Sequence, residues 1–131
     1  MKKAKTISVV SVPVGKPATL KEISTDLKSL QSEVGGTMQC VYPFTDEVGL
    51  ICNDEGKLLN LPLNRAIKYE GISGRNIYDI IAGDFFIAYC PMTSENFESM
   101  PYDLAEKYLK MFKYPEKFIL KDSIVYICPE I

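Results

Sequence analysis

Apolar and polar residues alternate along the first part of the chain. The segment from Lys5 to Val14 is rich in β-branched residues, and its alternation predicts a strand. After turn residues at 15–17 the apolar spacing becomes helical. Thr19 precedes Glu22 by three residues, which is the pattern of a capping box. Four apolar residues then recur at helical spacing before Gly35, namely Ile23, Leu27, Leu30 and Val34. We therefore predict a helix of about four turns that starts at Thr19 and ends at Gly35.

The middle of the chain alternates with a period of two. This pattern predicts strands over Thr37–Phe44 and Val48–Cys52. The sequence Asn53-Asp54-Glu55-Gly56 fits a type I turn with its glycine in the left-handed conformation. We therefore predict a hairpin in which Lys57–Leu61 returns beside the preceding strand. Residues 64–75, with glycines at 71 and 74, are predicted to form a loop.

The second half contains short apolar runs separated by turn residues. Ile77–Ile81 and Phe85–Cys90 flank the turn residues Gly83-Asp84. The run over Phe85–Cys90 is apolar on both faces, as in a central strand covered on both sides. A polar loop over 91–98 leads to Ser99 and Pro101, which open a predicted helix. Its apolar face carries Leu104, Tyr108 and Met111/Phe112. Phe118–Cys128 is predicted to be a final strand.

This order of elements predicts an α+β fold. A strand and a helix are followed by a run of strands, then by a helix and a strand, which favours a mostly antiparallel β-sheet with two main helices packed on it. The length of 131 residues suits one domain, residues 1–131, with a single core.

Charge and hydropathy narrow the classes of partner. The net charge is −2 and the basic residues do not form a continuous patch, so the sequence does not favour nucleic-acid binding. No apolar run approaches the roughly 20 residues that a membrane helix needs. The start of the chain does not resemble a signal peptide, because its apolar run is short and contains Pro13 and Gly15. We therefore expect a cytoplasmic protein without a membrane partner, and a homo-oligomer stays open.

The cysteines do not have the spacing of a metal site. Cys40, Cys52, Cys90 and Cys128 lie in four separate apolar runs, and the chain has no histidine. A zinc site would have to gather ligands from four elements without any C-x-x-C pair. We expect four reduced thiols that act as small buried hydrophobes, and we expect no metal and no cofactor.

Familiar catalytic arrangements are also missing. Without histidine there is no Ser-His-Asp or Cys-His pairing, and the glycines form neither a dinucleotide-binding fingerprint nor a phosphate-binding loop. Three carboxylate pairs are present, Asp46/Glu47, Asp54/Glu55 and Asp79/Asp84. The last pair flanks a buried-looking run, so it is the better candidate for acid–base chemistry. For Asp84 a role in the Gly83-Asp84 turn is favoured over catalysis.

The candidate binding residues lie around one arginine. Asn60, Asn64 and Arg65 form a polar cluster after the predicted strand, and Asp79 and Asp84 are the carboxylates that could face it. An arginine at a strand end can bind a carboxylate or phosphate through two hydrogen bonds. Arg65 could instead be a structural clamp that pairs with Asp79 or Asp84. The sequence leaves both roles open.

Four ordered segments of the chain resemble an uncharacterised family. They are Leu27-x-x-Leu30-Gln31-x-x-Val34-Gly35-Gly36, Cys52 to Leu58, Leu61 to Arg65, and Asp79 to Asp84. In order and spacing they are similar to the domain of unknown function 3846 family, which occurs in phages, plasmids and integrated elements of bacteria. The resemblance covers roughly residues 7–112. It supplies no catalytic residue, and the strand predicted over Phe118–Cys128 lies outside it.

The resemblance implies a small accessory protein of a mobile genetic element. Such proteins often modulate host processes or blunt host defence. We expect a non-enzymatic protein that binds a host protein or a small signalling molecule. One alternative is a small hydrolase or lyase that uses Asp79, Asp84 and Arg65. The other is a structural or assembly partner.

Overall fold

The computed structural model describes residues 5–68 and 77–130. It contains nine strands and two helices in this part of the chain. In chain order they are β1 (Thr6–Val12), β2 (Thr19–Ser24), α1 (Leu27–Val34), β3 (Met38–Val41), β4 (Val48–Asn53), β5 (Leu63–Lys68), β6 (Ile77–Ala82), β7 (Phe85–Tyr89), α2 (Tyr102–Met111), β8 (Glu116–Lys121) and β9 (Ile124–Pro129). The α+β class is confirmed.

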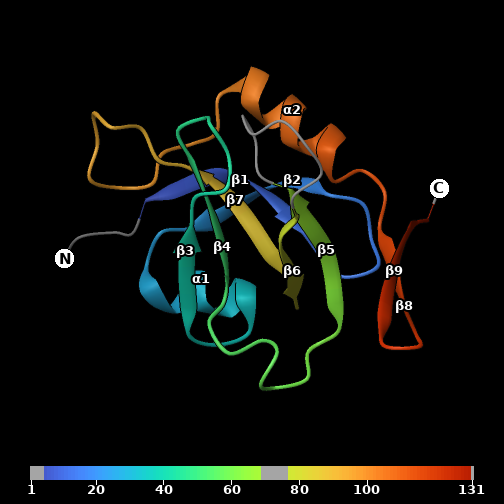
Figure 1. Cartoon of the computed structure of the whole chain (residues 1–131). Helices are drawn as coiled ribbons and strands as arrows, with labels where there is room; N and C mark the ends of the chain where they lie inside the picture. Colours follow the sequence, from blue (N-terminus) through green and yellow to red (C-terminus); the bar gives the residue numbers. More distant parts are fainter. Residues whose placement is uncertain (1–4, 69–76, 131) are drawn as a thin grey trace.

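A five-stranded antiparallel sheet organises the core, in the order β2-β1-β7-β4-β3. Figure 1 shows α1 and α2 on opposite sides of this sheet. The prediction that residues 85–90 form a central covered strand is confirmed, because β7 pairs with β1 on one edge and β4 on the other. Phe86 packs in the layer beneath α1, whereas Phe85 and Ile87 pack in the layer beneath α2. Successive side chains of a strand point to opposite faces, so both faces of β7 are apolar.

Each helix covers one face of the five-stranded sheet. α1 buries Leu30 and Val34, and Gly35 ends it in the left-handed conformation, as predicted. α2 begins after Pro101 and buries Ala105 and Tyr108. Within the described residues, no helix is long and apolar enough to cross a membrane.

The first half of the predicted helix is wrong. Residues 19–24 form the edge strand β2, in which Ile23 lies opposite Ile7 of β1. Both isoleucines are buried, while the capping-box residue Thr19 is exposed. The hydrogen bonds that β1 offers along its whole length outweigh a local helical pattern. α1 starts later, where the Asp26 carboxylate accepts a hydrogen bond from the backbone N–H of Ser29 at 2.9 Å.

The predicted hairpin over 48–61 is also wrong. Residues 54–60 form turns, and the next strand, β5, runs from Leu63 to Lys68 and so takes up the first part of the predicted loop. Gly56 does not take a left-handed conformation; Asn60 does, with φ 56°. Gly56 is required for a different reason: a Cβ there would lie 2.7 Å from the carbonyl oxygen of Ala82. The last part of the predicted loop, residues 69–75, lies outside the described residues.

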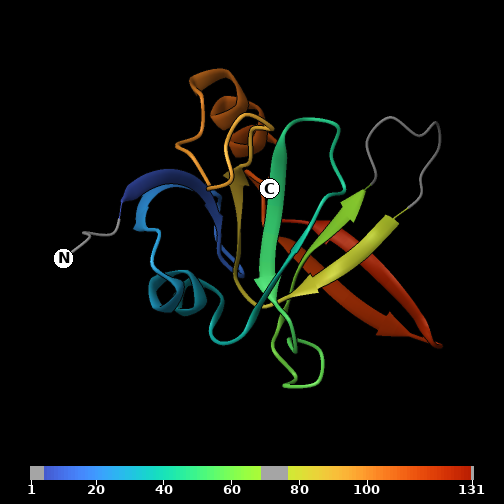
Figure 2. The ribbon, with the colours of Figure 1, turned by 90° about the vertical axis from the view of Figure 1, so that its left-hand side faces the viewer.

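The C-terminal segment is a hairpin rather than one strand. β8 and β9 pair antiparallel, and Lys121 lies opposite Ile124. Between them Asp122 and Ser123 have φ angles of 53° and 65°. A turn with two central residues in the left-handed conformation is a type I′ turn, and its twist matches that of the paired strands. This arm extends away from the body in Figures 1 and 2.

Candidate functional site

Asn64 and Arg65 are buried side by side, although both belong to strand β5. Their exposed fractions are 0% and 2%. Neighbours in a regular strand would point to opposite faces, but the pairing of β5 with β6 shifts register between Leu63 and Arg65. Such an irregularity turns the bulged strand and redirects its side chains.

Arg65 binds main-chain carbonyls. Its Nη2 donates to the carbonyl oxygens of Lys16 at 2.8 Å and Phe112 at 3.0 Å, and its Nη1 donates to Asn64 Oδ1 at 2.7 Å. Asn64 Nδ2 in turn donates to the carbonyls of Val12 and Gly83. These contacts are those of a structural clamp that joins β5 to the end of α2 and to the loop after β1. The expected carboxylate partners, Asp79 and Asp84, are not among the acceptors of the guanidinium.

Burial of this guanidinium has an energetic cost. Desolvation lowers the pKa of Arg65, and the charge of Glu116 partly opposes that shift. The Nε of Arg65 is buried without a hydrogen-bond partner. An unmet donor of this kind destabilises the fold, so the three hydrogen bonds to Asn64 Oδ1 and to the carbonyls of Lys16 and Phe112 must more than offset it.

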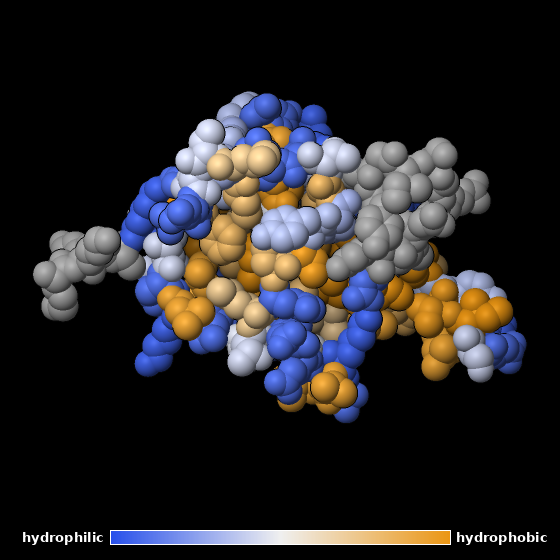
Figure 3. Space-filling model, turned by 60° about the vertical axis from the view of Figure 1, so that its left-hand side comes forward, coloured by the Kyte–Doolittle hydropathy of each residue, from blue (hydrophilic) through white to orange (hydrophobic). Residues whose placement is uncertain are grey.

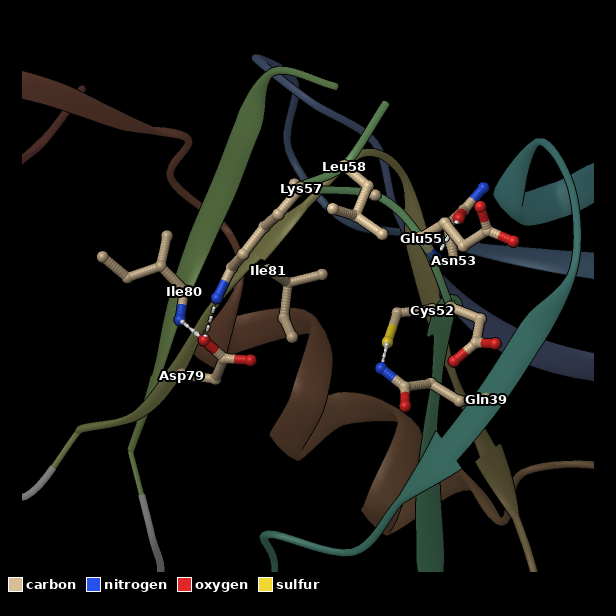
Figure 4. Close-up of a pocket in the computed structure, with 12 residues that line it drawn as sticks. Gln39, Cys52, Asn53, Glu55, Lys57, Leu58, Asp79, Ile80 and Ile81 are labelled. Atoms are coloured by element: carbon tan, nitrogen blue, oxygen red, sulfur yellow. Dashed lines mark hydrogen bonds and ion pairs between the residues drawn. The ribbon is translucent and has the colours of Figure 1, made fainter. Parts of the chain in front are cut away.

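Asp79 lies in a small polar pocket beside β6 (Figure 4). Its Oδ1 forms an ion pair with Lys57 and accepts the backbone N–H of Ile80 at 2.8 Å. Across the pocket, Gln39 Nε2 donates to Cys52 Sγ at 3.6 Å, and burial raises the pKa of this thiol. The volume is about 110 Å³, well below the roughly 300 Å³ at which small-molecule sites begin. The pocket suits a few waters or one inserted side chain.

The two other predicted residues lie elsewhere. An Oδ1 atom of Asp84 accepts the backbone N–H of Val14 at 2.9 Å, and Asn60 is exposed in the turn before β5. Asp79, Arg65 and Asp84 line three different hollows. This geometry does not bring the three side chains around one reacting atom.

The β8–β9 hairpin carries a group of exposed apolar side chains. Its exposed apolar side chains are Ile119, Leu120, Ile124, Val125 and Tyr126. Leu120 is 73% exposed and Ile124 is 54% exposed. The register places Ile119 opposite Tyr126 on one face, and Leu120 opposite Val125 on the other. Figure 3 shows apolar side chains gathered on this arm.

The hairpin is attached mainly at its base. There, Glu116 accepts the backbone N–H of Ala66 at 2.7 Å. A cavity of about 310 Å³ opens beside this contact, between β5, the end of α2 and the hairpin. It is lined by Phe44, Arg65, Ala66, Ile67, Lys68, Met111, Phe112, Tyr114, Glu116 and Pro129. The walls are mainly apolar, with one exposed cation, Lys68, at the rim.

Sequence reasoning missed this hairpin as a surface. It predicted one strand from Phe118 to Cys128 and gave it no functional weight. The signal was the pair Asp122-Ser123 between two apolar runs, which is typical turn chemistry.

The fold and its surface define a class: a small α+β domain with a projecting apolar arm. A family model described as Domain of unknown function (DUF3846) matches residues 7–113. The match covers most of the chain, so this protein belongs to that family, and the resemblance is confirmed. Searches of curated proteins and of solved structures found no match. The family match ends just before β8, so the hairpin is an addition to the part that the family model describes.

Proposed function

We propose that this is a non-enzymatic binding protein that docks on a partner protein through its β8–β9 hairpin. The observation that carries the proposal is the apolar character of both exposed faces of this arm. A two-stranded hairpin is marginal in water unless a face is covered. Exposed apolar patches of this kind mark interaction surfaces in soluble proteins.

The flanking charges suit a docking surface with a defined orientation. Lys117 and Lys121 alternate with Ile119 along one face of β8. A partner with an apolar groove and an acidic rim would cover the apolar residues and meet the two cations, because polar rims around apolar centres are usual at protein interfaces. We propose a protein of the bacterial host as this partner, encountered in the cytoplasm, with the chain acting as an accessory protein of a mobile genetic element.

A double variant tests the hairpin. Ile119→Thr/Ile124→Thr removes apolar surface but keeps β-branched residues, which favour strands. The matched control is Leu58→Thr/Leu59→Thr, which removes two exposed apolar side chains that lie outside the hairpin. Tagged full-length chains serve as bait in a bacterial host lysate. We expect a protein retained by the wild type and by the control variant, and lost with the isoleucine variant, at unchanged circular dichroism.

Two outcomes would refute this proposal. Equal capture by the isoleucine variant would move the docking surface away from the hairpin. A concentration-dependent dimer in sedimentation velocity, abolished by the same variant, would mean that a second copy of this chain covers the arm. Structural or assembly roles would then become the better interpretation.

A small molecule is the second candidate ligand, favoured by the cavity at the base of the hairpin. Its volume of about 310 Å³ is at the lower end of the range for small-molecule sites. Lys68 at its rim favours a ligand with an anionic group. Mass spectrometry of compounds released on denaturation tests this idea, and Lys68→Ala should abolish the released species while the hairpin variant retains it.

A further inference from the structure

Two thiols and a phenol meet over one glycine of the central sheet. Cys40 comes from the edge strand β3, Cys90 follows β7, and Gly49 lies in β4 between them. A Cβ built on Gly49 would lie 2.5 Å from Cys40 Sγ, 3.3 Å from Cys90 Sγ and 3.4 Å from Tyr42 Cε1. No larger residue fits there, so the absent side chain creates the space in which these three groups converge.

Hydrogen bonds within this cluster favour one ionised sulfur. Cys90 and Tyr42 both donate to Cys40, which lowers the pKa of the Cys40 thiol to about 7. The same contact raises the pKa of Tyr42 to about 12 and raises that of Cys90. The Cys90 thiol also lies 3.5 Å from the carbonyl of Ala88. A hydrogen bond from Cys90 to the Cys40 thiolate is stronger than one from Cys90 to the Ala88 carbonyl, because the thiolate acceptor is charged.

Cys40 is less buried than the cysteine beside it in the sheet. It is half-buried on the edge strand, whereas Cys52 is buried on the other face of the sheet. Among the residues that the structure describes, the titratable groups that interact with Cys40 are Cys90, Tyr42 and Cys52. The carboxylate nearest to Cys40 along the chain, Asp46, accepts hydrogen bonds from Lys107 at 2.6 Å and Tyr108 at 2.7 Å.

We propose that Cys40 is a nucleophilic thiol that forms a mixed disulfide with low-molecular-weight disulfides. The Cys40 thiolate attacks one sulfur of R–S–S–R. A bond forms between Cys40 Sγ and that sulfur, the S–S bond of the reagent breaks, and R–S⁻ leaves and takes a proton from water. No further oxidant is needed, since the reagent disulfide supplies the oxidising equivalents.

Cys90 is a hydrogen-bond donor in this site and not a resolving thiol. Its segment and that of Cys40 are separated by strand β4, so two strand spacings of about 4.8 Å lie between their backbones. A disulfide requires Cα atoms within about 7 Å. The Cys40 adduct is therefore expected to persist without conversion to a Cys40–Cys90 disulfide.

The expected rate advantage follows from the thiolate population. At pH 7 a thiol with a pKa near 7 is about half ionised, compared with about 1% for an ordinary thiol of pKa 9. The lower basicity reduces intrinsic nucleophilicity by roughly tenfold. Cys40 should therefore react about five times faster than an unperturbed thiol of equal exposure.

Oxidised glutathione is the probe for this site. The full chain is incubated with it at several pH values, and adducts are counted by intact mass and located by peptide mapping. Cys128, which is exposed on the hairpin, provides the internal reference. We expect one fast adduct at Cys40, with a rate midpoint near pH 7. Tyr42→Phe and Cys90→Ala should each shift that midpoint upward, and Cys40→Ser should remove the fast phase.

Three results would overturn the assignment. The first is that Cys128 is labelled before Cys40. The second is that neither Tyr42→Phe nor Cys90→Ala moves the pH midpoint of the Cys40 reaction rate. The third is that a Cys40–Cys90 disulfide is the product. Tyr42 is 68% exposed, so its conversion to Phe leaves the fold intact and keeps the test decisive if Cys90→Ala is unstable.

Discussion

Replacement of Arg65 by Ala tests the clamp most directly. The guanidinium is 2% exposed and makes three short hydrogen bonds, to Asn64 Oδ1 and to the carbonyls of Lys16 and Phe112. The variant leaves these three acceptors without their donor, two of them in buried surroundings. It also removes the link between β5, the end of α2 and the loop after β1.

The size of the loss can be estimated from these contacts. Hydrogen bonds to a charged group contribute about 1.5–3 kcal/mol each, but burying the guanidinium offsets part of the sum. We expect Arg65→Ala to lower the free energy of unfolding by about 3–5 kcal/mol. For a chain of this size each kcal/mol corresponds to roughly 3–5 °C in melting temperature, so the drop should be on the order of 10–20 °C.

Thermal melting by circular dichroism measures the effect. Lys68→Ala is the matched control, because Lys68 is an exposed cation at the end of the same strand and should change stability by less than about 0.5 kcal/mol. Arg65→Lys keeps the charge but loses the planar fork, so it should melt between the wild type and Arg65→Ala. If Arg65→Ala melted within about 3 °C of the wild type, the clamp would be refuted. A stable Arg65→Ala variant that no longer bound its ligand would make Arg65 a ligand contact.

Three smaller predictions concern local features. Gly56→Ala should destabilise the fold by about 1–3 kcal/mol, because the added Cβ would press on the Ala82 carbonyl. Urea denaturation measures the loss, with Lys57→Ala as the control, and an unchanged urea midpoint for Gly56→Ala would contradict the prediction. Tyr108→Phe should cost about 1–2 kcal/mol, because the buried hydroxyl donates to Asp46 at 2.7 Å, and an equal urea midpoint would show that this bond contributes nothing net. Hydrogen bonds from Ser24 and Ser29 lower the pKa of Asp26 from 3.8 to about 2. The Asp26 carboxylate therefore stabilises the fold above pH 3.8, and this contribution is lost as the pH falls through 2. The difference in melting temperature between the wild type and Asp26→Asn should shrink between these two pH values, and a difference constant with pH would refute the capping role.

Features that depend on neighbours in the sequence were predicted well. The central strand β7 is recognisable because all of its positions are apolar, and such a run needs cover on both faces. α1 ends at Gly35, because glycine takes the left-handed conformation at little cost. α2 follows Pro101, which suits the start of a helix and shows in the sequence.

Features that depend on distant partners were missed. Residues 19–24 carry a helical pattern, yet they become a strand because β1 supplies a complete row of backbone partners. The roles of Gly49 and Gly56 are likewise set by atoms from other segments that pack against them, and not by turn conformation.

The sequence by itself determined the α+β class, the covered central strand, the end of α1 at Gly35, the start of α2 after Pro101, and the family. Only the tertiary structure decided the contacts of the candidate residues. Arg65 reaches the carbonyls of Lys16 and Phe112, which lie 49 and 47 residues away along the chain, and a backbone carbonyl is present at every position of any sequence. No residue pattern can indicate which carbonyl will be used, because packing brings it within reach. Local periodicity therefore predicts elements, whereas long-range packing decides which polar groups meet.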